Sequence, residues 1–469
     1  MATCSRFIGA ALGFCLCISP TVHAQAVAGI TTGDVIPENA PLIAVGAPAT
    51  GRTQTLNFGV TVGIAETDNV LQTPTDPRAQ TISLTGIDFG WIRTGSALSA
   101  NVGGNFDYLD YFQGAYPSQL LGRFDGQTSL SLFEDHLKWY LQDDFGEGQL
   151  DAYTPVTPEN LQKINYLSTG PEVTLRPISD TVVQLGARYA IATYQISPLN
   201  GWRTSENVLL ERLLSARSDV ALGADLEQLR FDDSILNPNY DRGRYYVRYD
   251  ISGARTQITA AVGETQTNDG GAWLATPFLQ FNLTRAIAQR TSFNLTAGRE
   301  FTDAAGAFGD VRNGAAGGIA VAPVAQTTAD YLRTYATAGL QLTGFRTTVN
   351  ATAYWERDTY ATDSVFDVTR ASLELLASRQ LSNVLSANIF GTITRSQYFS
   401  QGGDVDTHAI GAGVTWQASR MLAFDGRYIH NFQGTSGAGY GFSSNTVFVT
   451  VTYRPVQPRG LQQQQPQQQ

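Results

Sequence analysis

Three of the four histidines are the side chains best suited to acid–base chemistry, and their surroundings argue against catalysis. His136 lies in a predicted turn, whereas His408 and His430 alternate in step with apolar neighbours. A general base must face a polar pocket, so histidines on an apolar face are poorly placed. Asp404 and Asp406 lie close enough to His408 for a dyad to be considered, but aspartates are common in exposed connections. We therefore expect no catalytic residues and no enzymatic activity.

The three cysteines, Cys4, Cys15 and Cys17, all lie in the first 24 residues. That segment has a cationic start at Arg6, a short apolar run and a small-residue site at 22–24, which is the order of a secretory signal peptide. We expect residues 1–24 to be cleaved; no lipobox surrounds the cysteines, so a lipid anchor is the less favoured alternative. The mature chain then has no thiol for a disulfide, a metal site or a nucleophile. Without a glycine-rich phosphate loop or metal-ligand spacing, we expect no cofactor and no metal.

Charge and hydropathy exclude two further classes of protein. The formal net charge of -10 at pH 7 argues against nucleic acid as a partner. Mean hydropathy is -0.13, and no segment after the signal peptide has a continuous apolar run long enough for a helical membrane span. Gly, Phe and Tyr number 46, 23 and 20, which favours a strand-rich chain with aromatic surfaces. These values do not exclude a membrane β-barrel, because strands that alternate polar and apolar residues lower the mean hydropathy of a membrane-spanning chain.

Alternation with a period of two is the dominant pattern after residue 52. In 244–251, Arg, Tyr, Arg and Asp occupy the even positions, and Tyr, Val, Tyr and Ile occupy the odd ones. The same split recurs in 137–145 and 446–453. Because a helix would scatter these charges around its surface, the pattern predicts strands with one polar and one apolar face. Such segments repeat until Arg454.

Short and long connections alternate between these segments. The short ones fall near 94–96, 134–136, 179–180, 217–218, 252–254, 287–290, 343–344, 380–382 and 419–420. The longer ones fall near 67–78, 110–121, 146–160, 197–203, 232–241, 267–271, 303–329, 358–363, 399–404 and 433–442. Short turns at one rim and long loops at the other are typical of outer-membrane barrels. We predict an all-β, up-and-down transmembrane antiparallel β-barrel of about 20 strands (roughly 18–22) over residues 52–454, in the outer membrane with both termini periplasmic.

The alternative fold is a secreted all-β solenoid or a pair of β-sandwiches, which also alternate. Two features argue against it. Aromatic residues lie near the ends of the apolar faces, as a membrane interface requires; they include Trp91, Trp139, Trp355, Tyr428 and Tyr453. The opposite faces carry charge, which a sandwich core forbids and a water-filled lumen accepts.

The polar faces predict what lines the interior. A barrel of this size without a plug domain encloses an aqueous channel, and the segment before the first strand is too short for a folded plug. By parity, the pore-lining candidates are Arg123, Asp125, Lys138, Tyr140, Asp144, Arg188, Asp225, Glu227, Arg244, Tyr246, Arg248, Asp250, Glu300, Arg346, Tyr354, Glu356, Asp425 and Arg427. Such a wall shows small ions little preference and offers hydroxyl-rich solutes many hydrogen bonds and tyrosine rings. The simpler interpretation, which the sequence favours, is that these side chains only solvate the lumen.

Two interpretations of the longest connection, 303–329, stay open. Its glycine- and alanine-rich centre either folds inward and constricts the pore, or forms a tall hairpin above the membrane, which the sequence slightly favours. The other long loops are rich in acids. Divalent cations that bridge them to lipopolysaccharide phosphates are one interpretation, and a solvated acidic rim is the commoner case.

The two flanks of the predicted barrel differ in composition. Residues 25–51 are small, apolar and punctuated by prolines, and we expect an extended periplasmic leader. Residues 455–469 end in a glutamine-rich run, which we expect to be disordered in the periplasm. This tail either hangs free or recruits a partner.

The segment Asn57–Val70, with its Asp68-Asn69 corner, resembles the opening strand and loop of the β-barrel porin type 2 family, including outer-membrane barrels associated with exosortase and exopolysaccharide loci. The resemblance implies a channel without catalytic residues. For some members it also implies an exit pore for a secreted exopolysaccharide, paired with a periplasmic polysaccharide export protein. Our leading function is a porin-like channel for polar solutes; a structural or adhesive barrel with a closed lumen is the contrasting class. The other expected partners are outer-membrane lipid, lipopolysaccharide and the barrel assembly machinery.

Overall fold

The computed structural model describes residues 53–455 except 134–135, 152–153, 236, 269–270, 272, 313–329, 361–363, 400–402 and 437–440. The predicted signal peptide, the leader and the tail beyond Pro455 lie outside the described residues. Those three predictions stay predictions.

Twenty strands carry the fold. They are β1 (Thr53–Thr67), β2 (Gln80–Thr94), β3 (Leu98–Tyr111), β4 (Gln119–Phe133), β5 (Leu137–Gln149), β6 (Leu161–Ile178), β7 (Thr181–Tyr194), β8 (Gly201–Ser215), β9 (Ser218–Phe231), β10 (Tyr240–Ser252), β11 (Thr256–Asn268), β12 (Leu274–Ala288), β13 (Thr291–Thr302), β14 (Tyr331–Thr343), β15 (Thr347–Tyr360), β16 (Val368–Gln380), β17 (Leu385–Tyr398), β18 (Gly403–Gln417), β19 (Leu422–Thr435) and β20 (Phe442–Tyr453). The helix α2 (Ala304–Arg312) and two 3₁₀ turns, η1 (Pro158–Asn160) and η2 (Ser364–Phe366), lie in connections. Among the described residues, no helix is both long and apolar enough to cross a membrane.

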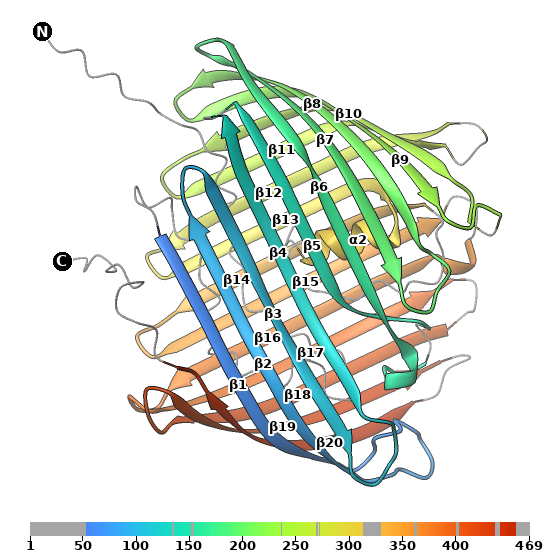
Figure 1. Ribbon diagram of the computed structural model, residues 1–469, viewed down its shortest axis with the longest axis vertical. Helices are drawn as coiled ribbons and strands as arrows, with labels where there is room; N and C mark the ends of the chain where they lie inside the picture. The colour runs from blue at the N-terminus through green and yellow to red at the C-terminus, as the bar shows by residue number, and fades with distance from the viewer. Residues whose placement is uncertain are drawn as a thin grey trace, which may run out of the picture.

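Every strand pairs antiparallel with the next, and the last strand closes the sheet on the first. β20 pairs with β1 over the register Val60↔Tyr453 to Thr67↔Thr446. Closure pairs the two terminal strands over this register, and paired edges are the condition for a sheet at bilayer depth. The predicted antiparallel barrel of 20 strands is confirmed, and Figure 1 shows the strands running obliquely around it.

The connections define two rims. The short turns after β2, β4 and every later even-numbered strand up to β18 form the short-turn rim, and the longer connections form the long-loop rim. In Figure 1 the short turns lie toward the upper left and the longer loops toward the lower right. The predicted connections match this division at both rims to within a few residues, because turn residues interrupt the alternation at each one.

The outer face of the barrel is apolar. Its exposed side chains include Val447, Val449 and Tyr453 on β20, while the intervening threonines are buried on the inner face. Exposed tryptophans of this outer face gather near both rims, with Trp139 and Trp416 toward the short turns. An apolar band with aromatic residues at its margins is the surface that a lipid bilayer requires.

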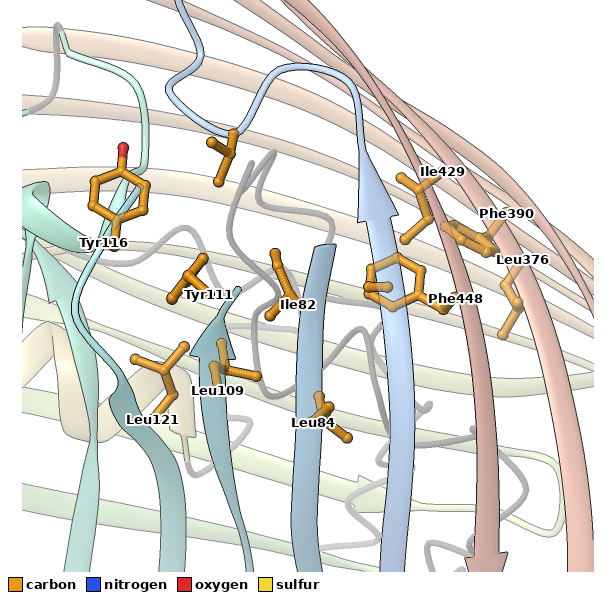
Figure 2. Close-up of a cluster of buried hydrophobic side chains, with 12 residues drawn as sticks. Ile82, Leu84, Leu109, Tyr111, Tyr116, Leu121, Leu376, Phe390, Ile429 and Phe448 are labelled. Atoms are coloured by element: carbon orange, nitrogen blue, oxygen red, sulfur yellow. The ribbon is translucent and has the colours of Figure 1, made fainter. Parts of the chain in front are cut away.

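Part of the inner face is apolar, in addition to the polar side chains of mixed charge that the sequence predicts there. Buried side chains from β16, β17, β19 and β20 and from β1 to β4 form one cluster, shown in Figure 2. Two loops contribute Val70 and Tyr116, so these loops pack against the inner wall near the long-loop rim. Ile82 and Leu84 share the parity of Asp88 on β2, and this shared parity is the sequence signal for their inward position. The cluster anchors loops at the mouth of the barrel.

Glycines on the inner face provide space for large neighbours. A Cβ added at Gly411 would lie 2.2 Å from Cζ of Phe390 and 2.7 Å from the backbone oxygen of Tyr428. The Phe390 ring therefore lies flat on the wall over Gly411, on the strand next to its own. Glycine at this position keeps the aromatic ring within the apolar cluster and out of the lumen.

Replacing Gly411 with valine is expected to displace the Phe390 ring and to lower the free energy of unfolding by about 1–3 kcal/mol. Gly90, also on the inner face, has nothing within 4 Å of an added Cβ, so Gly90→Ala is the matched control with little expected change. Urea titration of the barrel in phospholipid vesicles, followed by tryptophan fluorescence, measures both. Equal stability of the two variants would contradict this account of Gly411.

Candidate functional site

A helix inside the long-loop rim is the first feature of the candidate site. Asp303 caps the N-terminus of α2, with the Gly306 amide donating to its Oδ1 at 3.1 Å. Ala305 and Phe308 pack with Ile164, and with Tyr194 and other inward side chains of β6 and β7. The favoured interpretation of this connection as a tall hairpin is therefore wrong for residues 303–312. Apolar residues of α2 find buried contacts on the inner wall that a hairpin in water would not provide; residues 313–329 lie outside the described part.

Two arginines fix both ends of this connection to the wall. Arg203 on β8 forms a two-point ion pair with Asp303, at 3.1 and 2.7 Å. Arg242 on β10 lies 3.1 Å from Asp330, the residue that precedes β14. Glu227 on β9 accepts hydrogen bonds from Arg203 at 3.3 Å and from Arg242 at 3.0 Å. We call these five residues the helix anchor. Its ion pair between Arg203 and Asp303 joins residues 100 positions apart in sequence, and together these pairs hold α2 against β8–β10.

The helix anchor contains two guanidiniums and three carboxyls, so it carries one acidic group in excess. Burial alone would raise the pKa of the Asp303 carboxyl, but Arg203 and Arg242 beside it hold that pKa well below its usual range. Burial raises the pKa of Asp330 to about 7, against the opposing effect of Arg242. The excess acid is therefore Asp330, which takes up a proton near neutral pH.

This raised pKa gives a pH dependence with a defined sign. Between about pH 4 and pH 7 folded Asp330 binds a proton that the unfolded chain releases, so the free energy of unfolding falls as pH rises, by at most about 1.4 kcal/mol per pH unit. The variant Asp330→Asn lacks this contribution. We expect the stability of the wild type relative to this variant to fall from pH 4 to pH 7 and to level off above, in urea titrations at several pH values. A constant difference would refute the assignment.

A cavity of about 350 Å³ lies between α2 and the wall. Its lining comes from α2 and from β5, β6, β8, β9, β10, β11 and β13, and includes Tyr166, Arg244 and Glu300. Arg244 pairs with Asp225 at 2.7 Å and with Glu300 at 2.5 Å. The cavity thus has polar and charged walls together with an aromatic ring, as solute-binding sites commonly do.

A second charged cluster lies on β14, β15 and β16. Glu356 accepts bonds from Arg333 at 2.5 Å, from Arg370 at 2.6 Å and from the Tyr354 hydroxyl. Arg370 also lies 2.7 Å from Asp358. All five residues are buried. Buried charges are tolerated only when paired, and here each guanidinium meets at least one carboxylate.

Two smaller groups extend the polar wall. Arg248 lies 2.6 Å from Asp250 and 3.1 Å from Glu211 on β8. The guanidinium of Arg188 lies 4.5 Å from the centre of the Tyr140 ring. The Tyr140 ring, with one face covered by this arginine, has less surface to offer the hydroxyl-rich solutes for which the sequence suggested tyrosine contacts.

Of the pore-lining candidates, all except Arg346 lie within strands on the inner face, as the pairing registers show. Arg346 lies in the turn before β15 and is exposed there, because that turn is longer than its sequence suggests. Whether the others line an open pore stays a prediction. The predicted set of pore-lining residues lacks several inward side chains that form ion pairs. They are Arg203, Glu211, Arg242, Arg333, Asp358 and Arg370.

The histidines lie away from these clusters. His430 is on the outer face of β19, where Nδ1 lies 2.9 Å from Asn445 Oδ1. His408 is on the outer face of β18, with its ring 5.6 Å from that of Phe432. His136 lies in the β4–β5 turn, against the backbone oxygen of Thr174. In the described part of the chain, no group of three or more His, Cys, Asp or Glu side chains is arranged to hold a metal ion.

Comparison with known proteins gives one family match. The family described as "Putative beta-barrel porin 2" matches residues 327–455, which correspond to β14–β20. The match confirms the suspected family over this segment, which is not the segment Asn57–Val70 that suggested the resemblance. No curated protein matches the sequence.

Comparison with solved structures gives matches of low sequence identity, which include two receptors and an iron transporter. The siderophore receptor PirA from Pseudomonas aeruginosa has 12% identity and a TM-score of 0.44, with 86% of this chain and 81% of that chain covered. The FrpB iron transporter from Neisseria meningitidis has 8% identity and a TM-score of 0.43, with 85% and 82% covered. A mutant of the ferric enterobactin receptor PfeA from Pseudomonas aeruginosa has 11% identity and a TM-score of 0.44, with 86% and 80% covered.

The closed barrel, its apolar outer face and the family match lead to one conclusion. The chain is an outer-membrane β-barrel protein whose residues 327–455 match the porin family described as "Putative beta-barrel porin 2".

Proposed function

We propose that this protein is a passive channel for polar solutes, with a water-filled lumen that α2 narrows from one side. The observation that carries the proposal is the polar inner wall of a closed 20-stranded barrel. A barrel of this size is too wide for wall side chains alone to fill. Charged groups such as Arg244, whose side chain is 36% exposed, meet solvent there.

The balance of charge on the inner face sets the expected selectivity. Among the described inward residues, acidic side chains outnumber basic ones; Asp88, Asp107 and Glu374 are three acids on strands whose inner faces carry few arginines. A wall with excess negative charge concentrates cations. We therefore expect the channel to prefer cations moderately. The sequence alone suggested that small ions of either sign would pass with little preference.

The orientation that fits this function places the long-loop rim outside the cell and the short-turn rim, with both chain ends, in the periplasm. Short periplasmic turns and longer external loops are the rule for such barrels. Outer-membrane lipid and lipopolysaccharide then surround the barrel, and the barrel assembly machinery inserts it.

Liposome swelling tests the proposed function. Vesicles that contain the purified full-length barrel are expected to admit arabinose faster than the tetrasaccharide stachyose, because a constricted aqueous pore selects by size. Swelling no faster than that of protein-free vesicles would overturn the proposal and favour the barrel with a closed lumen.

An exit pore for a secreted exopolysaccharide is the second candidate, because residues 327–455 match the porin family whose resemblance implied such a pore for some members. Such a pore would work with a periplasmic polysaccharide export protein. Adjacent genes for glycosyltransferases and a polysaccharide co-polymerase, together with loss of secreted polymer on deletion of this gene, would support export. Unchanged secretion after deletion would exclude it.

A further inference from the structure

The cavity beneath α2 has the size and the lining of a solute-binding site. Its volume of about 350 Å³ suits a small organic molecule. Gly306 of α2 lines one side, and Tyr166, Asn207 and Thr265 line the wall. The helix anchor holds this side of the cavity in place, since Arg203 joins α2 to β8 through Asp303.

One arginine shared by two carboxylates is the chemical centre of this cavity. Nε and a terminal nitrogen of Arg244 both contact Oδ2 of Asp225, at 2.8 and 2.7 Å. The other terminal nitrogen contacts Oε2 of Glu300 at 2.5 Å. Arg244 thus engages one oxygen of each carboxylate. Because each carboxylate oxygen accepts more than one hydrogen bond, both acids keep capacity for a further donor.

The charge around the cavity is negative in sum. The two carboxylates of Asp225 and Glu300 carry one more charge than the single guanidinium of Arg244. In the helix anchor behind the cavity, the one carboxyl in excess of the guanidiniums is Asp330, so the anchor adds negative charge only where that carboxyl is ionised. All three side chains at the centre keep part of their surface exposed, at 36% for Arg244, 26% for Asp225 and 19% for Glu300. A bound molecule would therefore meet accessible acceptors in a negative potential.

We propose that this cavity retains solutes that carry a protonated primary amine. An ammonium group is a compact positive charge with three donors, and Asp225 and Glu300 supply acceptors and the opposing charge. Asn207 and Thr265 lie on the same lining and are placed to contact the remainder of the solute, whereas the Tyr166 ring already has the Arg203 guanidinium 5.3 Å from its centre. The inference rests on the proposed channel function and names the class of solute that the channel favours.

Calorimetric titration of the full-length barrel in detergent micelles tests the proposal with two probes of matched length. 1,4-Diaminobutane carries ammonium groups, and butane-1,4-diol carries neutral hydroxyls at the same positions. We expect the diamine to bind and the diol to bind at least about tenfold more weakly, a difference typical of one close charge interaction. Equal binding of the two probes would overturn the proposal.

Two single substitutions test the location of the site. Asp225→Asn and Glu300→Gln each remove one negative charge and leave Arg244 paired with the other carboxylate, so each is expected to fold. Each is expected to weaken diamine binding by about tenfold. Asp219→Asn removes one charge from the same face of β9 outside the cavity lining, and we expect binding within about twofold of the wild type. An equal loss in all three variants would refute the site.

Failure of this inference and failure of the channel function give different results. If the barrel swells liposomes but does not bind the diamine, the channel function is supported and the amine site is contradicted. If the barrel binds the diamine in micelles but admits no solute into liposomes, the amine site is supported and the channel function is contradicted.

Discussion

Replacing Arg203 with alanine is expected to lower the free energy of unfolding by about 3–5 kcal/mol, the usual cost of removing one partner from a buried ion pair. The side chains of Arg203 and Asp303 are 7% and 4% exposed, so water cannot replace the missing guanidinium easily. Asp303 would keep the hydrogen bond from the Gly306 amide and a 3.4 Å contact with Arg242, but it would lose its two-point ion pair. Urea titration in phospholipid vesicles measures the effect.

The double variant Arg203→Ala with Asp303→Ala is the sharper measurement. Removing both charges relieves the unpaired carboxylate, so the double variant should lose less stability than the sum of the two single variants. The Asp303 substitution also removes the cap of α2, worth about 1 kcal/mol by itself. Strict additivity would show that the two side chains do not interact, and would contradict the helix anchor.

Replacing Glu356 with alanine is expected to be the other strongly destabilising change, by about 3–5 kcal/mol. Its carboxylate accepts bonds from Arg333, Arg370 and Tyr354, and its side chain is 6% exposed. Arg370 would keep Asp358, whereas Arg333 would keep its 3.3 Å contact with the Tyr354 hydroxyl and the Tyr335 ring, 4.6 Å from its guanidinium. A buried guanidinium without a carboxylate is costly.

The control for this variant is Glu264→Ala, which removes an exposed carboxylate from the outer face of β11. Exposed charges contribute little, so we expect a change within about 0.5 kcal/mol. If Glu356→Ala were as stable as this control in the same urea titration, the cluster on β14–β16 would not support the wall.

The fold was predictable from the sequence because a period of two is a local property. In 244–251 the alternation alone assigns each side chain to a face, and the structure places Arg244, Tyr246 and Arg248 together on the inner one. The order of short and long connections then determined the number of strands, since each interruption of the pattern marks a turn. Neither inference needed any contact between distant residues.

The candidate site was predictable only in part, because its pairings are not local. Arg203 and Glu206 lie on opposite faces of β8, with Arg203 on the inner face and Glu206 on the outer one. The presence of a charge therefore did not show which face of this strand is the inner one. Arg242 lies beside Asp241, at the end of a predicted loop. The inward fold of α2 depends on Phe308 meeting β6 and β7, more than a hundred residues away. Sequence periodicity contains no information on such contacts.

Conductance of the purified full-length protein in planar lipid bilayers tests the central claim, a water-filled lumen, most directly. We predict stepwise ohmic currents in symmetrical potassium chloride and, in a salt gradient, a reversal potential of the sign that indicates preference for potassium. Absence of channel current, in the wild type and after deletion of 303–329, would contradict the account.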